Sequence, residues 1–134
     1  MVYLTKKVHF SASHVLKNPE LSERENKRLF GKRGLPHGHN YTLEVTICGE
    51  ADKKTGFCLD FEHLTETIER EVLSVVNYKH LDENSPFLGG KNPTAENLVK
   101  TFWKKLEVAL PQGSLCEIKL QQKESETVSY RGEL

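Results

Sequence analysis

Residues 41–47 alternate strictly between apolar and polar side chains, and this alternation constrains the fold more than any other feature of the chain. Successive side chains of a β-strand point to opposite faces, so the pattern predicts a strand with one buried and one polar face. A weaker alternation from Leu4 to His14 predicts another strand of this kind. Such strands need a layer that covers their apolar face. The apolar members of the first segment are Tyr41, Leu43, Val45 and Ile47.

Two later segments carry apolar side chains at helical spacing and can supply that layer. The first is expected to run from Phe61 to about Val76, after Asp60, which can cap a helix. The second follows Pro93, a residue suited to a first helical turn, and ends near Leu110. We therefore predict two amphipathic helices.

The remaining segments complete the predicted order of elements. Residues 116–121 and 128–130 alternate and predict two more strands, whereas residues 17–38 and 77–92 are expected to be loops. The order β-β-α-α-β-β predicts an α+β fold, with an antiparallel four-stranded sheet and two helices on one face. At 134 residues the chain fits a single domain, residues 1–134. The open edges of such a sheet predict a homo-oligomer whose subunits pair their edges.

The charge balance and the apolar runs argue against two classes of partner. The chain carries 19 basic and 19 acidic side chains without a long run of either sign, so no nucleic acid partner is expected. Its apolar runs are far shorter than the ~20 residues of a membrane helix, and the first residues lack a signal-peptide core. We therefore expect no membrane partner and a cytoplasmic location.

The cysteines predict neither a disulfide framework nor a thiolate zinc site. Cys48, Cys58 and Cys116 are odd in number and show no CxxC spacing. We expect them to be small buried side chains.

Three of the six histidines form a candidate metal site. His37 and His39 are two residues apart, so extended backbone places both imidazoles on the same side of a strand. His14 ends the preceding strand, and antiparallel pairing of the two strands can bring it beside them. Three neutral imidazoles with an open fourth position are typical of a catalytic zinc site. The spacing alone does not separate this interpretation from surface or capping histidines.

Six short motifs follow one another along almost the whole chain. They are Phe10-Ser11-Ala12-Ser13-His14, Leu29-Phe30-Gly31-Lys32, His37-Gly38-His39-Asn40-Tyr41, Gly56-Phe57-Cys58-Leu59-Asp60-Phe61, Pro93-Thr94-Ala95-Glu96-Asn97 and Tyr130-Arg131-Gly132-Glu133. In sequence and in order, these motifs resemble the 6-pyruvoyltetrahydropterin synthase and 6-carboxytetrahydropterin synthase family.

The resemblance implies the tunnelling fold, in which β-β-α-α-β-β subunits form trimers around a barrel and usually stack as hexamers. It also implies zinc bound by His14, His37 and His39, and sites that lie between subunits. The implied substrate is a reduced pterin, typically 7,8-dihydroneopterin triphosphate, in tetrahydrobiopterin or queuosine biosynthesis.

The same resemblance assigns residues to the pterin. Glu96 matches the family glutamate that holds the guanidine-like edge of the pterin, and Thr94 lies in the same motif. A carboxylate facing an N–H pair forms a bidentate, charge-assisted contact. Gln122 matches a further family glutamate on the third strand. The alternative for Glu96 is a first-turn glutamate that interacts with the helix dipole.

The proton-transfer residues of the family do not recur. Arg33 stands at the position of the family's cysteine, and it keeps its proton at neutral pH, so it cannot act as a base. Asn77 and Tyr78 stand at the positions of the aspartate and histidine that tune that cysteine. Gly34 occupies the position at which some relatives carry a glutamate instead. These losses suggest a divergent paralogue.

Other side chains can take over these roles. His80 and Asp82 can supply a displaced base, or His80 is an exposed loop histidine. Arg33 can bind a triphosphate or a carboxylate, or it is solvated. Tyr78 can donate a proton or only pack. Lys32 belongs with Arg33 to a basic cluster that draws in an anionic substrate or balances nearby glutamates.

We therefore expect a zinc-dependent, pterin-handling enzyme with side-chain lyase chemistry, either elimination of triphosphate or cleavage of a carbon–carbon bond. The alternative is a non-catalytic pterin- or purine-binding zinc protein on the same scaffold.

Overall fold

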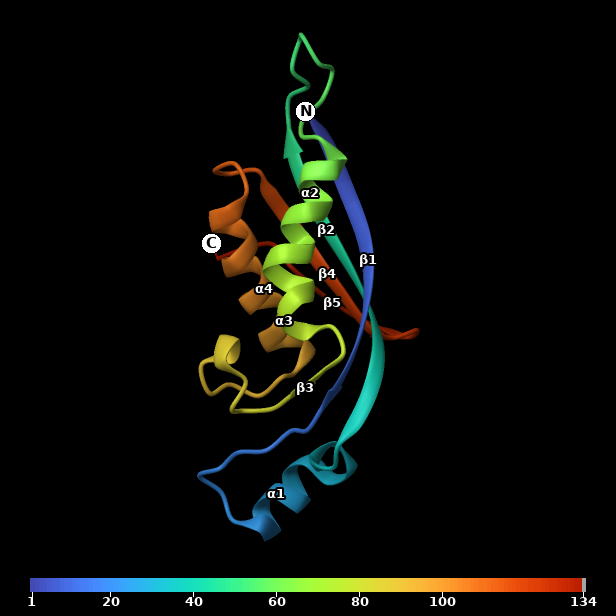
Figure 1. Cartoon of the computed structure of the whole chain (residues 1–134). Coiled ribbons are helices and arrows are strands. Elements are labelled where there is room, and N and C mark those ends of the chain that lie inside the picture. The colour runs from blue at the N-terminus through green and yellow to red at the C-terminus, as the bar shows by residue number, and fades with distance from the viewer. Residues whose placement is uncertain (134) are drawn as a thin grey trace.

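A computed structural model describes residues 1–133 of the chain. Its sheet contains five strands in the order β3-β1-β2-β4-β5, with helices on one face (Figure 1). The predicted α+β fold is confirmed. The strands are β1 (Val2–His14), β2 (His37–Gly49), β3 (Lys79–Leu81), β4 (Leu115–Lys123) and β5 (Glu126–Tyr130).

The pairing of β1 with β2 forms the long axis of the sheet. The two strands are antiparallel, and their register runs from Val2 opposite Gly49 to His14 opposite His37. β4 pairs with β2 and β5 pairs with β4, both antiparallel. The end of β1 and the beginning of β2 therefore lie side by side, as the sequence predicted.

The short strand β3 is a correction to the predicted four-stranded antiparallel sheet. It lies in the segment that we expected to be a loop, and it pairs in parallel with the end of β1, with Ser13 opposite His80. The backbone N–H of Tyr78 also donates to the carbonyl of Ser11 at 2.6 Å. Three residues are too few to show an alternating pattern in the sequence. The strand is recognised only by its pairing with the edge of β1.

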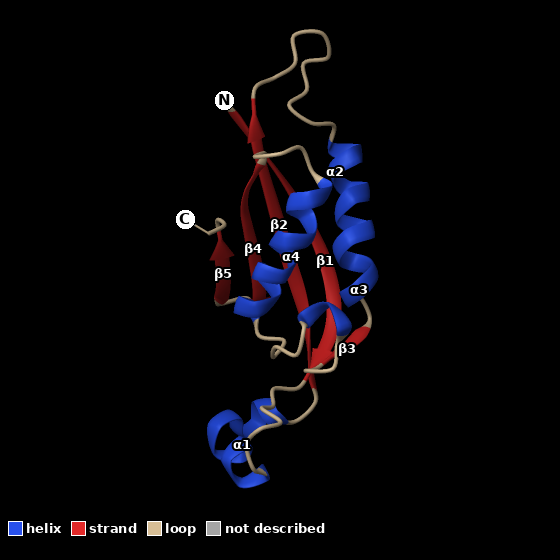
Figure 2. Ribbon diagram, turned by 90° about the vertical axis from the view of Figure 1, so that its left-hand side faces the viewer, coloured by secondary structure: helices blue, strands red, loops and turns tan. Residues whose placement is uncertain are grey.

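Two helical segments cover the apolar face of the sheet (Figure 2). Asp60 caps the first segment by accepting from the N–H of Glu62 at 2.9 Å, and Thr94 caps the second by accepting from the N–H of Asn97 at 3.2 Å. The first segment ends at Val76, as predicted. The segments are α2 (Phe61–Ile68), which continues through a π-helical turn (Glu69–Leu73) into α3 (Ser74–Val76), and α4 (Ala95–Ala109).

The core lies between the sheet and these helices. The four alternating apolar side chains of β2 are at most 1% exposed, which confirms the face assigned to them. The ring of Phe10 on β1 stacks on that of Tyr41, with 4.5 Å between centroids. Phe102 of α4 meets Phe10 edge-on. This packing fixes the faces of β1 and β2 and, with them, the direction of every side chain on both strands.

The segment 17–38 is not the plain loop that we predicted. It contains α1 (Glu23–Phe30) and a 3-10 turn, η1 (Gly31–Gly34), which lie beyond the end of the sheet (Figure 1). No residue of α1 is buried, and its sequence carries no stripe of apolar side chains from which a helix could be predicted. Its start carries a capping signal, because the Ser22 hydroxyl accepts from the N–H of Glu25 at 3.1 Å.

The expectation of unpaired, buried cysteines is also wrong. Cys48 and Cys116 form a disulfide between β2 and β4, across a bulge in their pairing. All three cysteines are half-buried, and Cys58 has no disulfide partner among residues 1–133. The two bonded residues are 68 positions apart, so strand pairing, and not a local spacing pattern, brings them together.

Among residues 1–133, no helix combines the length and the hydropathy needed to cross a membrane.

Candidate metal and ligand site

Three histidines converge where β1 ends and β2 begins. The Nε2 atom of His14 lies 2.8 Å from Nε2 of His37 and 3.1 Å from Nε2 of His39. One ring nitrogen of each histidine can be chosen so that all three lie within 4.8 Å of one another. The strand register produces this convergence, because it sets His14 opposite His37 and Ala12 opposite His39.

Backbone carbonyls fix how two of these rings are protonated. Nδ1 of His14 lies 2.9 Å from the carbonyl oxygen of Pro93, and Nδ1 of His37 lies 2.8 Å from that of Leu35. A carbonyl oxygen only accepts, so both Nδ1 atoms carry the proton and donate it. The two neutral rings then face each other with Nε2 lone pairs. Such an arrangement fits a cation held between them, and carbonyl-oriented imidazoles are typical of metal ligands.

Burial favours the neutral form that a metal needs in two of the rings, those of His14 and His39. His14 is only 2% exposed, and its burial lowers its pKa to about 4. The pKa of His39 is also lowered, chiefly by burial and then by the neighbouring His37. Tyr41 lies below them with its hydroxyl 3.4 Å from Nδ1 of His14, and burial raises the pKa of that hydroxyl well above its usual range.

The three rings open into a cleft of about 580 Å³, which we call the histidine cleft. Among the other residues that line it are all four that were predicted from the sequence to bind the substrate. The structure thus gathers the predicted metal ligands and the predicted substrate-binding residues in one cavity. These four residues are Arg33, Thr94, Glu96 and Gln122.

Local structure explains how these side chains reach the cleft. Glu96 is exposed in the first turn of α4, directly after the capping Thr94. The carbonyl of Pro93, just before α4, accepts a hydrogen bond from Nδ1 of His14. This bond fixes the start of α4 next to the predicted metal ligands. On the other wall, the carbonyl of Arg33 accepts from the N–H of Leu16 at 2.9 Å. That bond fixes η1 beside the end of β1.

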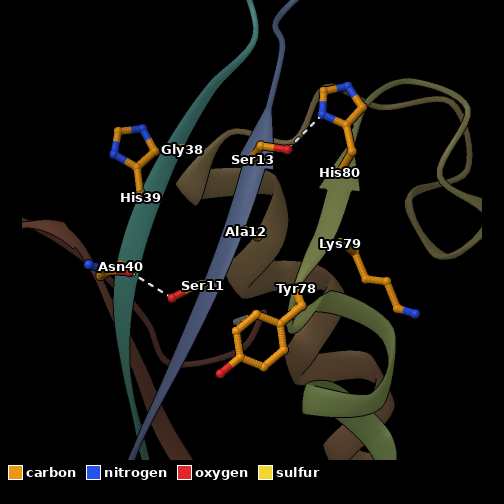
Figure 3. Close-up of a pocket in the computed structure, with 9 residues that line it drawn as sticks. All are labelled: Ser11, Ala12, Ser13, Gly38, His39, Asn40, Tyr78, Lys79 and His80. Carbon is orange, nitrogen blue, oxygen red and sulfur yellow. Dashed lines mark hydrogen bonds between the residues drawn. The ribbon is translucent and has the colours of Figure 1, made fainter.

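His80 and Asp82 lie elsewhere. His80 lines a shallow hollow of about 550 Å³ on the polar face of the sheet, which we call the β3 depression (Figure 3). Its Nδ1 lies 2.8 Å from the Ser13 hydroxyl, and its Nε2 lies 3.9 Å from a carboxylate oxygen of Asp82. Of the three clustered histidines, only His39 lines both cavities. Within one copy of the chain, His80 therefore lines a different cavity from His14 and His37, and Asp82 lines neither of the two.

Tyr78 lines the same depression, and Asn77 directly precedes it in the chain but has different surroundings. The Asn77 side-chain oxygen accepts from the N–H of Ser11 at 3.1 Å, so this amide holds β3 against β1. Tyr78 is 85% exposed and has a φ of 60°, a left-handed conformation that is uncommon for a residue other than glycine. Within one copy of the chain Tyr78 therefore makes little packing contact, and both roles considered for it stay predictions.

Two residues of the histidine cleft were missed by the sequence analysis. Lys123 ends β4 and Glu126 begins β5, on either side of a two-residue turn, and both line the cleft. Charged residues beside a turn are usually solvated, which hides such a pair. No sequence pattern could have revealed them, because successive strand residues normally point to opposite faces and the pairing of β4 with β5 shifts its register between Gln121 and Lys123.

Comparisons with known proteins place the chain in a family. A family model described as "6-pyruvoyl tetrahydropterin synthase" matches residues 3–133. The 6-pyruvoyl tetrahydrobiopterin synthase of Dictyostelium discoideum is 38% identical over 132 residues, covering 98% of this chain and 97% of that protein. The human protein of the same name is 36% identical over 132 residues, covering 97% and 91%. The structure of Caenorhabditis elegans 6-pyruvoyl tetrahydropterin synthase matches with a TM-score of 0.90 at 30% identity, covering 98% and 96%.

Proposed function

This chain belongs to the 6-pyruvoyl tetrahydropterin synthase family, and from that premise we propose that it is a zinc-dependent lyase acting on the side chain of a reduced pterin. The proposed substrate is 7,8-dihydroneopterin triphosphate or a close relative. One observation carries the proposal: three converging imidazole nitrogens lie in the same cleft as Thr94, Glu96 and Gln122.

We propose that His14, His37 and His39 hold the zinc ion. Two of these rings are already oriented by carbonyls, and burial keeps His14 neutral, so the donor set fits the metal. When bound, zinc polarises an oxygen of the substrate and stabilises the negative charge that develops on it.

Glu96 is the proposed anchor for the pterin ring. Its carboxylate is exposed to the cleft and makes no hydrogen bond or ion pair with another residue in the range 1–133. A carboxylate in this state is available to accept two N–H bonds from the pterin edge. Thr94 and Gln122 add uncharged polar groups to the lining, and the amide of Gln122 can both donate and accept.

The proposal for proton transfer differs from the standard set of the family. Arg33 remains charged, and the amide of Asn77 has no basicity at neutral pH, so neither residue can serve as a base. We propose His80, with Asp82 beside it, as the substitute. Because His80 lines the β3 depression, it reaches the substrate only where the depression of one subunit faces the histidine cleft of another.

Both edges of the sheet support such an assembly. β3 covers only Ala12, Ser13 and His14 of β1, so in the described part of the chain most of β1 is without a partner on that side. β5 forms the opposite edge. We propose that subunits join these edges into a barrel, as a trimer or a stacked hexamer. Sedimentation equilibrium tests this directly, and a monomer at micromolar concentration would contradict it.

A second candidate function is a zinc protein that binds a pterin or a purine without converting it. The residues at the positions of the family's cysteine, aspartate and histidine favour it, since none of Arg33, Asn77 and Tyr78 is a base at neutral pH. This candidate predicts ligand binding that depends on Glu96 and no turnover.

The deciding experiment incubates the zinc-loaded protein with 7,8-dihydroneopterin triphosphate and identifies products by mass spectrometry. A zinc-dependent product supports the lyase, and its mass identifies the reaction. His37→Ala is the control, because it should lose the metal and the product together. Unchanged substrate at high protein concentration, with binding retained, would favour the second candidate.

A further inference from the structure

Three cationic side chains line the histidine cleft from two sides. Lys32 and Arg33 come from η1, and Lys123 comes from the end of β4. Two carboxylates, those of Glu96 and Glu126, line the same cleft. If Glu96 anchors the pterin, three cations face a single remaining carboxylate, which leaves this part of the cleft positively charged.

The cations on η1 are not engaged by the protein. Lys32 makes no ion pair or side-chain hydrogen bond with any residue from 1 to 133. Arg33 uses only Nε, which donates to the carbonyl of Phe30 at 3.3 Å. Its two terminal nitrogens have no partner in the described chain and keep the planar fork that matches phosphate oxygens.

The third cation is held by a weak internal partner. Nζ of Lys123 lies 3.7 Å from a carboxylate oxygen of Glu126, and both side chains are 58% exposed. The two residues are opposite each other across the strands β4 and β5, so the hairpin keeps them adjacent. Exposed ion pairs of this kind contribute little, and an anion with several negative oxygens can displace the carboxylate.

We propose that Lys32, Arg33 and Lys123 form a subsite for a polyphosphate group, and that Glu126 holds Lys123 until this group arrives. The inference rests on the proposed function in one respect, namely that the group is carried by the pterin substrate. Cations on two sides of a cleft can contact an extended polyanion at several points, whereas a ligand with a single carboxylate would reach only one side. Glu126 then acts as a competitor for Lys123, so its removal strengthens binding.

Isothermal titration calorimetry with inorganic tripolyphosphate tests the subsite without any turnover. Lys123→Met should weaken binding by about tenfold, the loss of one charge-assisted contact. Glu126→Gln should strengthen binding by roughly threefold, since it removes only a weak competitor. Lys104→Met, on α4 outside the cleft, is the matched control and should change nothing. All three positions are exposed, so the variants should fold, and equal melting temperatures check this.

The measurement is made on the zinc-loaded protein and repeated after zinc removal, because tripolyphosphate also binds metals. Opposite effects of the Lys123 and Glu126 variants in both forms support the subsite. Equal affinities for the wild type and Lys123→Met, or binding that vanishes with the zinc, would overturn it.

A second pair of titrations separates the sources of the polyphosphate. If the group belongs to the substrate, Lys123→Met weakens binding of 7,8-dihydroneopterin triphosphate and leaves that of 7,8-dihydroneopterin unchanged. If the variant weakens only tripolyphosphate, the subsite stands but its ligand is a free polyphosphate. Binding of tripolyphosphate through these residues with no product from any pterin would retain the subsite and reject the lyase.

Discussion

The histidine cleft and the β3 depression are neighbours that share His39, yet their polar groups are organised in opposite ways. In the cleft, lone pairs of the clustered histidines point at one another, and Glu96 has no partner among residues 1–133. In the depression, Ser11 bonds to Asn40 at 2.6 Å and Ser13 bonds to His80 at 2.8 Å. Groups that converge without satisfying one another need a ligand, whereas groups that satisfy one another hold a surface in shape.

The largest expected difference between the two regions concerns the metal. His37→Ala should reduce zinc affinity by at least about a hundredfold, more than the loss of an outer hydrogen bond typically costs. Metal content per subunit after dialysis measures this. His80→Ala, in the depression, should keep full zinc content, and loss of zinc in that variant would break the distinction.

The pH dependence of the metal-free protein provides the next test. The pKa of His14 is about 4 in the folded state, against 6.5 for an exposed histidine, so the unfolded chain binds more protons. Stability contributed by this site is therefore complete above pH 6.5 and falls as the pH drops toward 4, by up to about 3 kcal/mol. Thermal melting across this range should show the loss, and His14→Gln should reduce it. If the melting temperature of His14→Gln falls with pH as steeply as that of the wild type, groups other than His14 cause the loss of stability.

Glu96→Gln should weaken binding of a reduced pterin by roughly tenfold or more, because a charge-assisted bidentate contact becomes a neutral one. Fluorescence titration with 7,8-dihydroneopterin measures the change. Glu107→Gln lies on the same helix outside the cleft and is the control. Equal weakening in both variants would mean that charge on α4 matters and position does not.

The smallest effect is expected in the depression. Ser11→Ala removes the hydrogen bond to Asn40 from a part-exposed surface and should cost about 0.5–1 kcal/mol of unfolding free energy. Zinc content and pterin binding should stay at wild-type values. Chemical denaturation gives the stability, and a loss of zinc would show that the two regions are coupled through β1.

The sequence was most informative for β1 and β2, because the same alternation predicts both the strands and the side on which their histidines lie. The alternation of β1 and β2 fixes their faces, so the i, i+2 spacing of His37 and His39 and the position of His14 are enough to predict that the three rings meet. Thr94, Glu96 and Gln122 came from a resemblance in motifs, and the structure places all three in one cleft with the histidines.

The remaining features depend on contacts that have no local pattern. β3 exists because β1 offers an edge, and α1 buries none of its residues. Lys123 reaches the cleft only because the β4–β5 hairpin ends there. His80 was considered as a base for the metal site, but it pairs with Ser13 and lies with it in the depression. The cavity that His80 lines depends on the pairing register of β3 with β1. A three-residue strand has no sequence pattern from which that register could be predicted.

The disulfide between β2 and β4 has a topological consequence. It closes a covalent ring that runs from Cys48 to Cys116 and contains both helical segments and the projecting segment 50–57 (Figure 1). A trypsin cut at Lys53 or Lys54, both exposed, therefore opens the backbone without releasing a fragment. The nicked protein should migrate as one band on a denaturing gel until a thiol reductant divides it into two.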